Sequence, residues 1–345
     1  MMNAGKNNAI LGSLLGTAVG DALGLPYEGL SRRRVAAMGG IRHRFFWGRG
    51  MFSDDTEHTL MLAAALHQHS NDTCRFQNRF AWKLRWWLLG LPAGVGLSTA
   101  MAILRLWLGF PPSKAGVRSA GNGAAMRSAI VGVLCRDEAT KRRELALAAC
   151  RVTHTDPRAE ESALLVTEAA ALATNGILTD QVITLLELFV TSDEMQSRFS
   201  KLKIGLAKGQ SVLDYAAEIG CERGVTGFAP NTVAVALFAW LRHRGQFEAT
   251  IHSVIQCGGD TDTVAAITGG ICGAEVGENG IPQPWITAIC DWPRSVKHIR
   301  QVAAALAGPP HPMPRIFWPE IILRNVFFLA VVLTHGFRRI MTSFR

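Results

Sequence analysis

The chain has 345 residues, of which 48 % are hydrophobic, 18 % are charged and 34 residues are glycine. This composition excludes collagen-like, coiled-coil, low-complexity and disordered chains and leaves a globular protein with a sizeable core. A formal net charge of +9 would suit a nucleic acid, an anionic surface or a small acidic ligand. The basic residues are dispersed, however, and no nucleic-acid-binding motif accompanies them, so we expect no nucleic-acid partner.

The seven cysteines are scattered along the chain, and none of them forms a CxxC pair. A zinc knuckle or a redox motif is therefore not supported. Most of the cysteines stand among apolar residues, as buried thiols do. We expect reduced core thiols in a cytoplasmic protein.

The first predicted element is the apolar segment 9–20, which has a glycine at every fourth position. The segment is similar to the hydrophobic part of a signal peptide, and cleavage is one alternative. The glycine spacing favours a core helix instead, because it gives a helix a bare ridge that a second helix can approach closely. Residues 269–273 repeat the spacing, and we expect the two ridges to pack together. The glycines are Gly12, Gly16 and Gly20 in the first ridge and Gly269 and Gly273 in the second.

Apolar residues recur at helical spacing along most of the chain, and period-two alternation is nearly absent. The best strand candidate is the short run Ile41–Trp47. We predict one all-α domain over residues 1–308, with a basic and apolar helical tail packed on it over residues 309–345. In the tail, Val326–Leu333 is too short for a membrane span, and we expect none. The predicted helices cover residues 56–68, 76–89, 97–108, 123–135, 142–152, 158–174, 179–191, 231–244, 246–256 and 263–274.

One predicted helix interleaves aromatic and basic side chains over residues 75–87. Such a mixture can form a platform on which bases stack. An amphipathic helix with a large apolar face explains the same pattern more simply, and we favour that interpretation. The residues are Arg75, Phe76, Arg79, Phe80, Trp82, Lys83, Arg85, Trp86 and Trp87.

Two acidic clusters stand at predicted helix N-termini. The first contains Ser53, Asp54, Asp55 and Thr56, and the alternative is a capping box in which Asp54 is the N-cap and Glu57 completes it. Capping accounts for one aspartate and the glutamate but not for the rest of the cluster.

The second cluster, Gly258–Thr263, has the same form, and one of its side chains could likewise be a cap. Clustered carboxylates repel one another unless a cation neutralises them. Ligation by oxygen alone suits Mg²⁺ or Mn²⁺ rather than zinc. The two clusters together therefore predict a paired-metal site joined across the fold.

Three further pieces carry weaker signals. The glycine-rich turn Gly121–Gly123 opens onto a predicted helix and could hold an anion with its backbone amides, although it matches neither a Walker loop nor a dinucleotide-binding fingerprint. His154 stands at a predicted turn and could be a structural polar residue only. Glu28 follows the N-terminal helix, where a lone carboxylate is usually solvated.

The order of these pieces resembles the ADP-ribosylglycohydrolase family, which includes the dinitrogenase-reductase-activating glycohydrolases and the ADP-ribosylarginine hydrolases. The resemblance spans about residues 8–300 and rests on the 20–28, 53–56, 121–127, 153–154 and 258–263 segments. It implies an all-α fold, a compact orthogonal multi-helix bundle of that family's type. It also implies two Mg²⁺ or Mn²⁺ ions at the base of an ADP-ribose cleft.

The resemblance also implies roles for individual residues. Metal ligands would be Ser53, Asp54, Asp55, Asp260, Asp262 and Thr263. Substrate-binding residues would be Gly121, Asn122, Gly123, Met126 and His154, and Glu28 would face the scissile bond. Asp55 or Asp262 is our expected general base, with Glu28 assisting. One departure is Ser53, where relatives often have threonine; it keeps the hydroxyl.

These roles predict a metal-dependent hydrolase that removes ADP-ribose from ADP-ribosylated protein, with arginine as the expected linkage. Carboxylates would stabilise the oxocarbenium character that develops on the ribose when the N-glycosidic bond breaks. One alternative is an immunity protein that neutralises an ADP-ribosyltransferase toxin by hydrolysis, by physical blocking or by both. Another is a non-catalytic ADP-ribose-binding module, and other ADP-ribose linkages also stay open.

Overall fold

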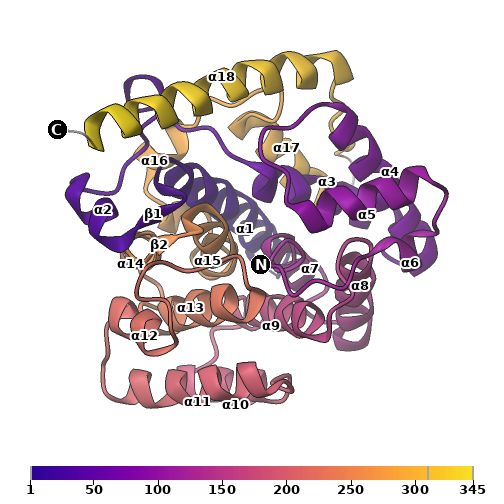
Figure 1. The fold of residues 1–345 in the computed structure, drawn as a ribbon. Coiled ribbons are helices and arrows are strands. Elements are labelled where there is room, and N and C mark those ends of the chain that lie inside the picture. Colours follow the sequence, from indigo (N-terminus) through magenta and orange to yellow (C-terminus); the bar gives the residue numbers. More distant parts are fainter. Residues whose placement is uncertain (1, 309–310, 344–345) are drawn as a thin grey trace.

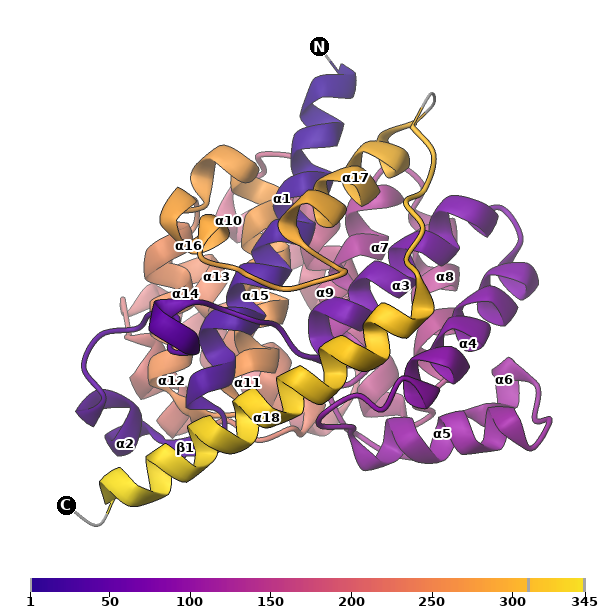
Figure 2. The same ribbon diagram turned by 90° about the horizontal axis from the view of Figure 1, so that it is seen from above.

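The computed structural model describes residues 2–308 and 311–343, and helices dominate these residues, as the sequence predicts. At its centre, helix α1 (Met2–Gly24) runs beside helix α15 (Thr261–Val276) (Figure 1). The other helices surround this pair, and helix α18 (Trp318–Ser343) crosses one side of the molecule (Figure 2).

The remaining elements follow in chain order. They are α2 (Arg32–Ala37), α3 (Asp54–His69), α4 (Thr73–Leu89), α5 (Leu97–Trp107), α6 (Pro112–Ala115), α7 (Ala129–Leu134), α8 (Ala139–Arg151), α9 (Pro157–Ala173), α10 (Thr179–Glu187), α11 (Asp193–Ala207), α12 (Val212–Glu218), α13 (Ala229–Arg242), α14 (Phe247–Gln256), α16 (Gln283–Thr287), α17 (Val296–Ala307), the short strands β1 (Leu30–Ser31) and β2 (Gly258–Gly259), and the 3-10 turns η1 (Leu25–Tyr27), η2 (Phe46–Gly48), η3 (Ala125–Arg127) and η4 (Glu278–Gly280).

The backbones of α1 and α15 touch along the predicted glycine ridges. A Cβ atom added to Gly12, Gly16 or Gly20 would lie 2.1 Å from a carbonyl oxygen of α15, on Gly273, Gly269 and Ala265 respectively. Only a helix without side chains on this face can come so close. The expected pairing of the two ridges is therefore confirmed, and the N-terminal segment is a buried core helix.

Strands β1 and β2 form a two-residue antiparallel pair that ties the end of α1 to the start of α15. Leu30 pairs with Gly259, and the amide of Gly29 donates to the carbonyl of Gly259 over 2.8 Å. Gly259 has φ 83° and leaves no room for a Cβ, which would lie 2.0 Å from the carbonyl oxygen of Val225. The pair brings the segment after Glu28 next to the second acidic cluster.

All ten predicted helical segments contain helices, although the 123–135 segment divides into η3 and α7. The sequence prediction misses α11, α12 and α17 and the short helices α2, α6 and α16. It is wrong about Ile41–Trp47, which forms no strand; within it only Phe45 makes an isolated bridge, to Arg49. The reason is a competing partner, because the Tyr27 hydroxyl accepts from the Arg42 amide over 3.1 Å and from Arg44 Nε over 2.7 Å.

Helix α18 occupies most of the predicted tail, whose residues 309–310 and 344–345 lie outside the described residues. Its inner face buries Ile321, Arg324, Asn325, Phe328 and Val331. Its outer face exposes other apolar side chains: Leu323, Val326, Leu329, Leu333 and Phe337.

Two helical stretches are long and apolar enough to cross a membrane, whereas we expected no such stretch from the sequence. Gly5–Tyr27 is 94 % buried inside the molecule, as a core helix would be. Trp318–Arg339 is 28 % buried. For this second stretch, the absence of a membrane span stays a prediction.

All seven cysteines are described as free thiols, and five of them are buried as expected. Cys74 and Cys290 are exposed, so the core interpretation is wrong for these two.

Replacing Gly16 with alanine should destabilise the protein strongly, because the new Cβ would overlap the Gly269 carbonyl oxygen in rigid backbone. We expect the free energy of unfolding to fall by about 3 kcal/mol or more. Thermal melting measures this, with Gly5→Ala on the same helix as the control, since a Cβ at Gly5 meets nothing within 4 Å. Equal melting temperatures for the two variants would contradict the close α1–α15 contact.

Candidate functional site

The N-termini of α3 and α15 open onto a cavity of about 520 Å³. All twelve site residues proposed from the sequence line this cavity, although they come from five separate parts of the chain: Glu28, Ser53, Asp54, Asp55, Gly121, Asn122, Gly123, Met126, His154, Asp260, Asp262 and Thr263. Sequence analysis did not foresee the opposite wall, which consists of residues 93–99 and of Leu329 and Val332 from α18. The volume lies within the range of small-molecule sites.

The start of α3 is capped from another helix, by Asp21 of α1. The Asp21 carboxylate accepts from the backbone amides of Ser53, over 2.8 Å, and Thr56, over 3.0 Å. The Thr56 hydroxyl also donates to it over 2.6 Å. The capping-box interpretation is therefore wrong: Ser53 is the N-cap residue, and Asp54 is the first residue of the helix. The Ser53 hydroxyl accepts from the Asp55 amide over 3.4 Å, and the distant Asp21 carboxylate adds to this local cap, which local spacing cannot reveal.

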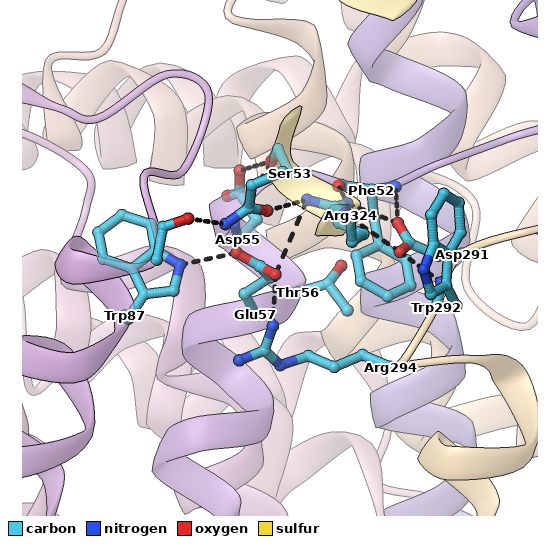
Figure 3. A network of polar contacts seen from close by, with 12 residues as sticks. Phe52, Ser53, Asp55, Thr56, Glu57, Trp87, Asp291, Trp292, Arg294 and Arg324 are labelled. Atoms are coloured by element: carbon cyan, nitrogen blue, oxygen red, sulfur yellow. Dashed lines mark hydrogen bonds and ion pairs between the residues drawn. The ribbon is translucent and has the colours of Figure 1, made fainter. Parts of the chain in front are cut away.

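Glu57, the other half of the predicted capping box, faces away from the helix start into a buried network (Figure 3). Its carboxylate accepts from Arg294 Nη1 and from Trp87 Nε1, each over 2.6 Å. Burial opposes ionisation of this group, but the charges of Arg294 and Arg324 outweigh it and hold the pKa of Glu57 below its usual value. Glu57 therefore stays charged and balanced inside the protein.

Arg324 of α18 extends the same network to the segment that enters α3 (Figure 3). Its Nη2 donates to the carbonyl of Phe52 over 2.6 Å and to Asp291 Oδ2 over 2.5 Å. The Phe52 amide in turn donates to Asp291 over 3.2 Å. The Arg324 side chain is only 2 % exposed. Residue 52 directly precedes the first acidic cluster, so Arg324 of α18 holds in place the backbone that leads into that cluster.

The second acidic cluster is also more than a cap. Asp260 occupies the N-cap position of α15, but its side chain makes no capping hydrogen bond there. It accepts instead from Asn122 Nδ2 over 2.7 Å. The Thr263 hydroxyl donates to Asp55 Oδ2 over 3.3 Å, which joins the two clusters directly. The sequence pattern thus predicted a real meeting point, although it did not predict that Asn122 would bind Asp260.

The carboxylates of the cavity oppose one another's ionisation. Burial is the largest effect, and the neighbouring carboxylates add to it, so the pKa of Asp55 and that of Asp262 are held well above the usual range. The same causes raise the pKa of Asp54 to about 8. No lysine or arginine is among the described residues that line the cavity. No cationic side chain at the described cavity wall therefore balances these carboxylates.

The residue types fit a hard divalent cation. Every candidate ligand is a carboxylate or hydroxyl oxygen, and Asp55 Oδ1 is buried with no hydrogen-bond partner among the described residues. Within the described ranges, however, no three acidic, imidazole or thiol groups stand close enough to form a finished metal cage. The candidate ligand groups hydrogen-bond one another instead. The Ser53 hydroxyl, for example, donates to Asp55 Oδ2 over 2.9 Å.

The glycine-rich turn lies against the His154 ring. A Cβ on Gly123 would come within 3.0 Å of His154 Cε1, and one on Gly121 within 3.3 Å of Nε2. Arg127 holds the turn in place, because it donates to the Gly123 carbonyl and, over 2.6 Å, to the Thr153 hydroxyl. Burial, followed by the charge of Arg127, lowers the pKa of His154 to about 3. His154 is therefore a neutral imidazole at neutral pH.

Comparison with known proteins agrees with this geometry. The ADP-ribosylglycohydrolase family model matches residues 2–312. A solved chain titled ADP-ribosylglycohydrolase-related protein complex superposes with a TM-score of 0.65 at 30 % identity, covering 88 % of this chain and 98 % of that one. Helix α18 begins after the stretch that the family model matches.

Three relatives show the range of similarity. An uncharacterized protein of Archaeoglobus fulgidus is 32 % identical over 81 % of this chain and 90 % of its own. The ADP-ribosyl-dinitrogen reductase glycohydrolase of Rhodospirillum rubrum is 26 % identical over 89 % of this chain and 98 % of its own. The ADP-ribosylarginine hydrolase Tri1 of Pseudomonas putida is 26 % identical over 84 % and 76 %.

Replacing Arg324 with methionine should leave Asp291 as a buried, unpaired acid. Breaking a buried pair in this way costs about 3–5 kcal/mol of stability. Thermal or urea unfolding measures the loss. Arg300→Met is the matched control, because Arg300 pairs with Glu278 at the surface, where such a pair contributes about 1 kcal/mol or less. Similar losses in both variants would show that α18 does not brace the acidic cluster.

Without divalent cations, stability should fall as pH rises from about 4 to 8. A carboxyl group whose pKa is higher in the folded state binds its proton more tightly there, so folding favours the protonated form. Asp54, with a pKa raised to about 8, is such a group. In EDTA at pH 8, Asp54→Asn should melt several degrees above the wild type, and at pH 4 the gap should close.

The control for this pH series is Asp137→Asn, because the Asp137 side chain is 73 % exposed. It should shift the melting temperature little at either pH. If Asp54→Asn gains no stability at pH 8, the carboxylates do not repel one another as described.

Proposed function

Because the chain belongs to the ADP-ribosylglycohydrolase family, we propose that it hydrolyses the N-glycosidic bond between ADP-ribose and an arginine side chain of a modified protein. The family supports glycohydrolase activity on ADP-ribosylated proteins, and the arginine linkage is our narrower inference. One observation carries it: two carboxylate clusters from distant parts of the chain face a single cavity beside a glycine-rich turn.

The arginine linkage is supported by the charge of the cavity and by the relatives. A guanidinium leaving group is a planar cation that pairs well with carboxylates. Glu28 is exposed and lines the cavity, so its carboxylate is available where a protein-bound guanidinium would enter. The two relatives named ADP-ribosylarginine hydrolase, from Pseudomonas putida and Serratia proteamaculans, are consistent with this choice. The toxin partner finds no support in these names, and we do not propose it.

We further propose two divalent cations, Mg²⁺ or Mn²⁺, as cofactors. Their ligands would be Ser53, Asp54 and Asp55 on the α3 side and Asp260, Asp262 and Thr263 on the α15 side. Such ions would neutralise the carboxylates and polarise the ribose hydroxyls and a water molecule. The substrate's diphosphate is itself negative, so a cavity wall with several acidic residues and no lysine or arginine would repel it without them.

In the reaction, the protein's carboxylates act on the positive charge that develops as the C1″–N bond lengthens. This oxocarbenium character is stabilised by nearby negative groups. Asp55 or Asp262 accepts a proton from the attacking water, whose oxygen forms the new bond to C1″. The C1″–N bond breaks with its electron pair staying on nitrogen, and the departing guanidine takes up the proton that the carboxylate has accepted from water. The Gly121–Gly123 turn and neutral His154 form the wall that orients the rest of the ligand.

The primary experiment measures free ADP-ribose released from an arginine-ADP-ribosylated protein, with Mg²⁺, with Mn²⁺ and with EDTA. We expect metal-dependent release that is lost in the Asp54→Ala/Asp55→Ala double variant. Asp137→Asn should retain full activity, since its carboxylate is exposed away from the cavity. Metal-dependent binding of ADP-ribose without release from arginine would indicate a binding module or another linkage and would contradict the proposal.

Metal binding itself has a readout independent of activity. Adding Mg²⁺ or Mn²⁺ to EDTA-treated protein should raise the melting temperature at pH 8, because an ion that binds only the folded state stabilises it. In Asp55→Asn the increase should be at least halved, while Asp137→Asn should behave as the wild type. No metal-induced shift in the wild type would exclude a cation at this cavity.

A further inference from the structure

A second and larger cavity, of about 780 Å³, lies away from the acidic site. It is an open cavity bordered by α3, α4, α17, the residues 312–316 and the start of α18. We call it the basic cavity, because its described lining contains no acidic residue. It contains six basic side chains: His67, Arg79, Lys83, Arg294, His298 and Arg315. Neither the family resemblance nor the proposed hydrolysis assigns any role to it.

Four of these six basic groups are not exposed, and two of those four lack partners among the described residues. The Lys83 ammonium makes no hydrogen bond or ion pair with any residue that the structure describes. The His298 ring, on a residue that is 9 % exposed, likewise makes no hydrogen bond within the described chain, where only its backbone amide is engaged. Neither group is among the described buried atoms that lack a partner, so both reach the open cavity and are free to meet a ligand there.

The basic groups also destabilise one another's charged forms. Burial, together with the charges of Arg79 and Arg294, lowers the pKa of Lys83 to about 8. Burial and the charges of Arg294 and Lys83 lower the pKa of His298 to about 4. Arg294 uses one nitrogen, Nη1, to bind Glu57 over 2.6 Å (Figure 3) and also lines the cavity. A bound anion would offset this repulsion.

Tryptophan side chains form one wall of the basic cavity. The ring centroids of Trp82 and Trp86 are 6.0 Å apart, and those of Trp86 and Trp318 are 5.5 Å apart. Trp82 is 46 % exposed and Trp86 is 39 % exposed, whereas Trp87 is buried. The amphipathic interpretation of residues 75–87 therefore explains the inner side of α4, with Phe76, Phe80 and Trp87, but leaves its outer tryptophans unexplained.

We propose that the basic cavity binds a nucleoside phosphate. The base would lie against the tryptophan wall, since aromatic side chains bind bases through stacking and apolar contact. The phosphate would lie at Lys83, Arg79 and the free side of Arg294. A cavity of this size accommodates a ligand of nucleotide dimensions. This ligand site is separate from the acidic cavity and does not depend on the proposed hydrolysis.

The test is a calorimetric titration of the full-length protein with adenosine 5′-monophosphate in EDTA. We expect saturable binding to the wild type and at least tenfold weaker binding to Lys83→Met. Trp82→Leu should weaken it by about tenfold, through loss of base contact. Both residues are partly exposed, so the variants should fold, and their melting temperatures verify this. Inorganic phosphate alone should bind more weakly than the nucleotide.

Two control variants distinguish binding at the basic cavity from binding elsewhere on the protein. Lys201→Met removes the same charge from α11, far from the cavity lining, and should leave binding unchanged. Asn122→Ala alters the acidic cavity and should also leave it unchanged. The proposal is overturned if the wild type does not bind at millimolar nucleotide, or if binding survives Lys83→Met and is lost in Asn122→Ala.

Discussion

The organisation of this protein depends on one electrostatic constraint: many carboxylates must be held together in a poorly solvated place. The fold treats them in three ways. Asp21 is engaged by backbone amides at the start of α3, which makes it a cap. Glu57 and Asp291 are balanced by Arg294 and Arg324. Asp54, Asp55 and Asp262 stand at the cavity wall with elevated pKa values and no cationic partner there. The acids with amide or arginine partners build the scaffold, and the acids without a cationic partner line the candidate site.

Backbone contact between α1 and α15 gives this constraint its geometry. Where the two helices meet, Gly24 lies against the backbone of Thr261, and the Thr261 hydroxyl donates to the Gly24 carbonyl over 2.8 Å. Asp21 is one helical turn back from this contact and Asp262 is one residue beyond it. Close packing of glycine against backbone is therefore what brings the cap of one acidic cluster beside the carboxylates of the other. A wider helix pair would separate them and would leave no shared cavity.

Much of this could be predicted from the sequence, and the failures have physical causes. Helical spacing gave the all-α class, and the glycine ridges predicted the central helix pair. Repeated acidic patterns at two helix starts predicted that residues 53–55 and 260–263 meet. The capping box failed because Ser53 and the distant Asp21 cap the helix in place of Asp54, and because the distant Arg294 binds Glu57. The strand at 41–47 failed because Tyr27 takes its polar groups. Sequence patterns indicate local preferences, whereas the conformation of these residues is set by hydrogen bonds to residues distant in the sequence.

Arg324 follows both acidic clusters in the chain, and this order has a consequence for how the protein assembles. Translation produces α18 after the helices that carry the acidic clusters, so these helices can assemble before their brace exists. Until Arg324 arrives, Asp291 is a buried acid without its cation, and the Phe52 carbonyl lacks its donor. The nascent molecule must either keep this region hydrated and open or protonate Asp291. Completion of the site thus waits for the synthesis of Arg324, and a chain that stops before this residue lacks the cation that pairs with Asp291.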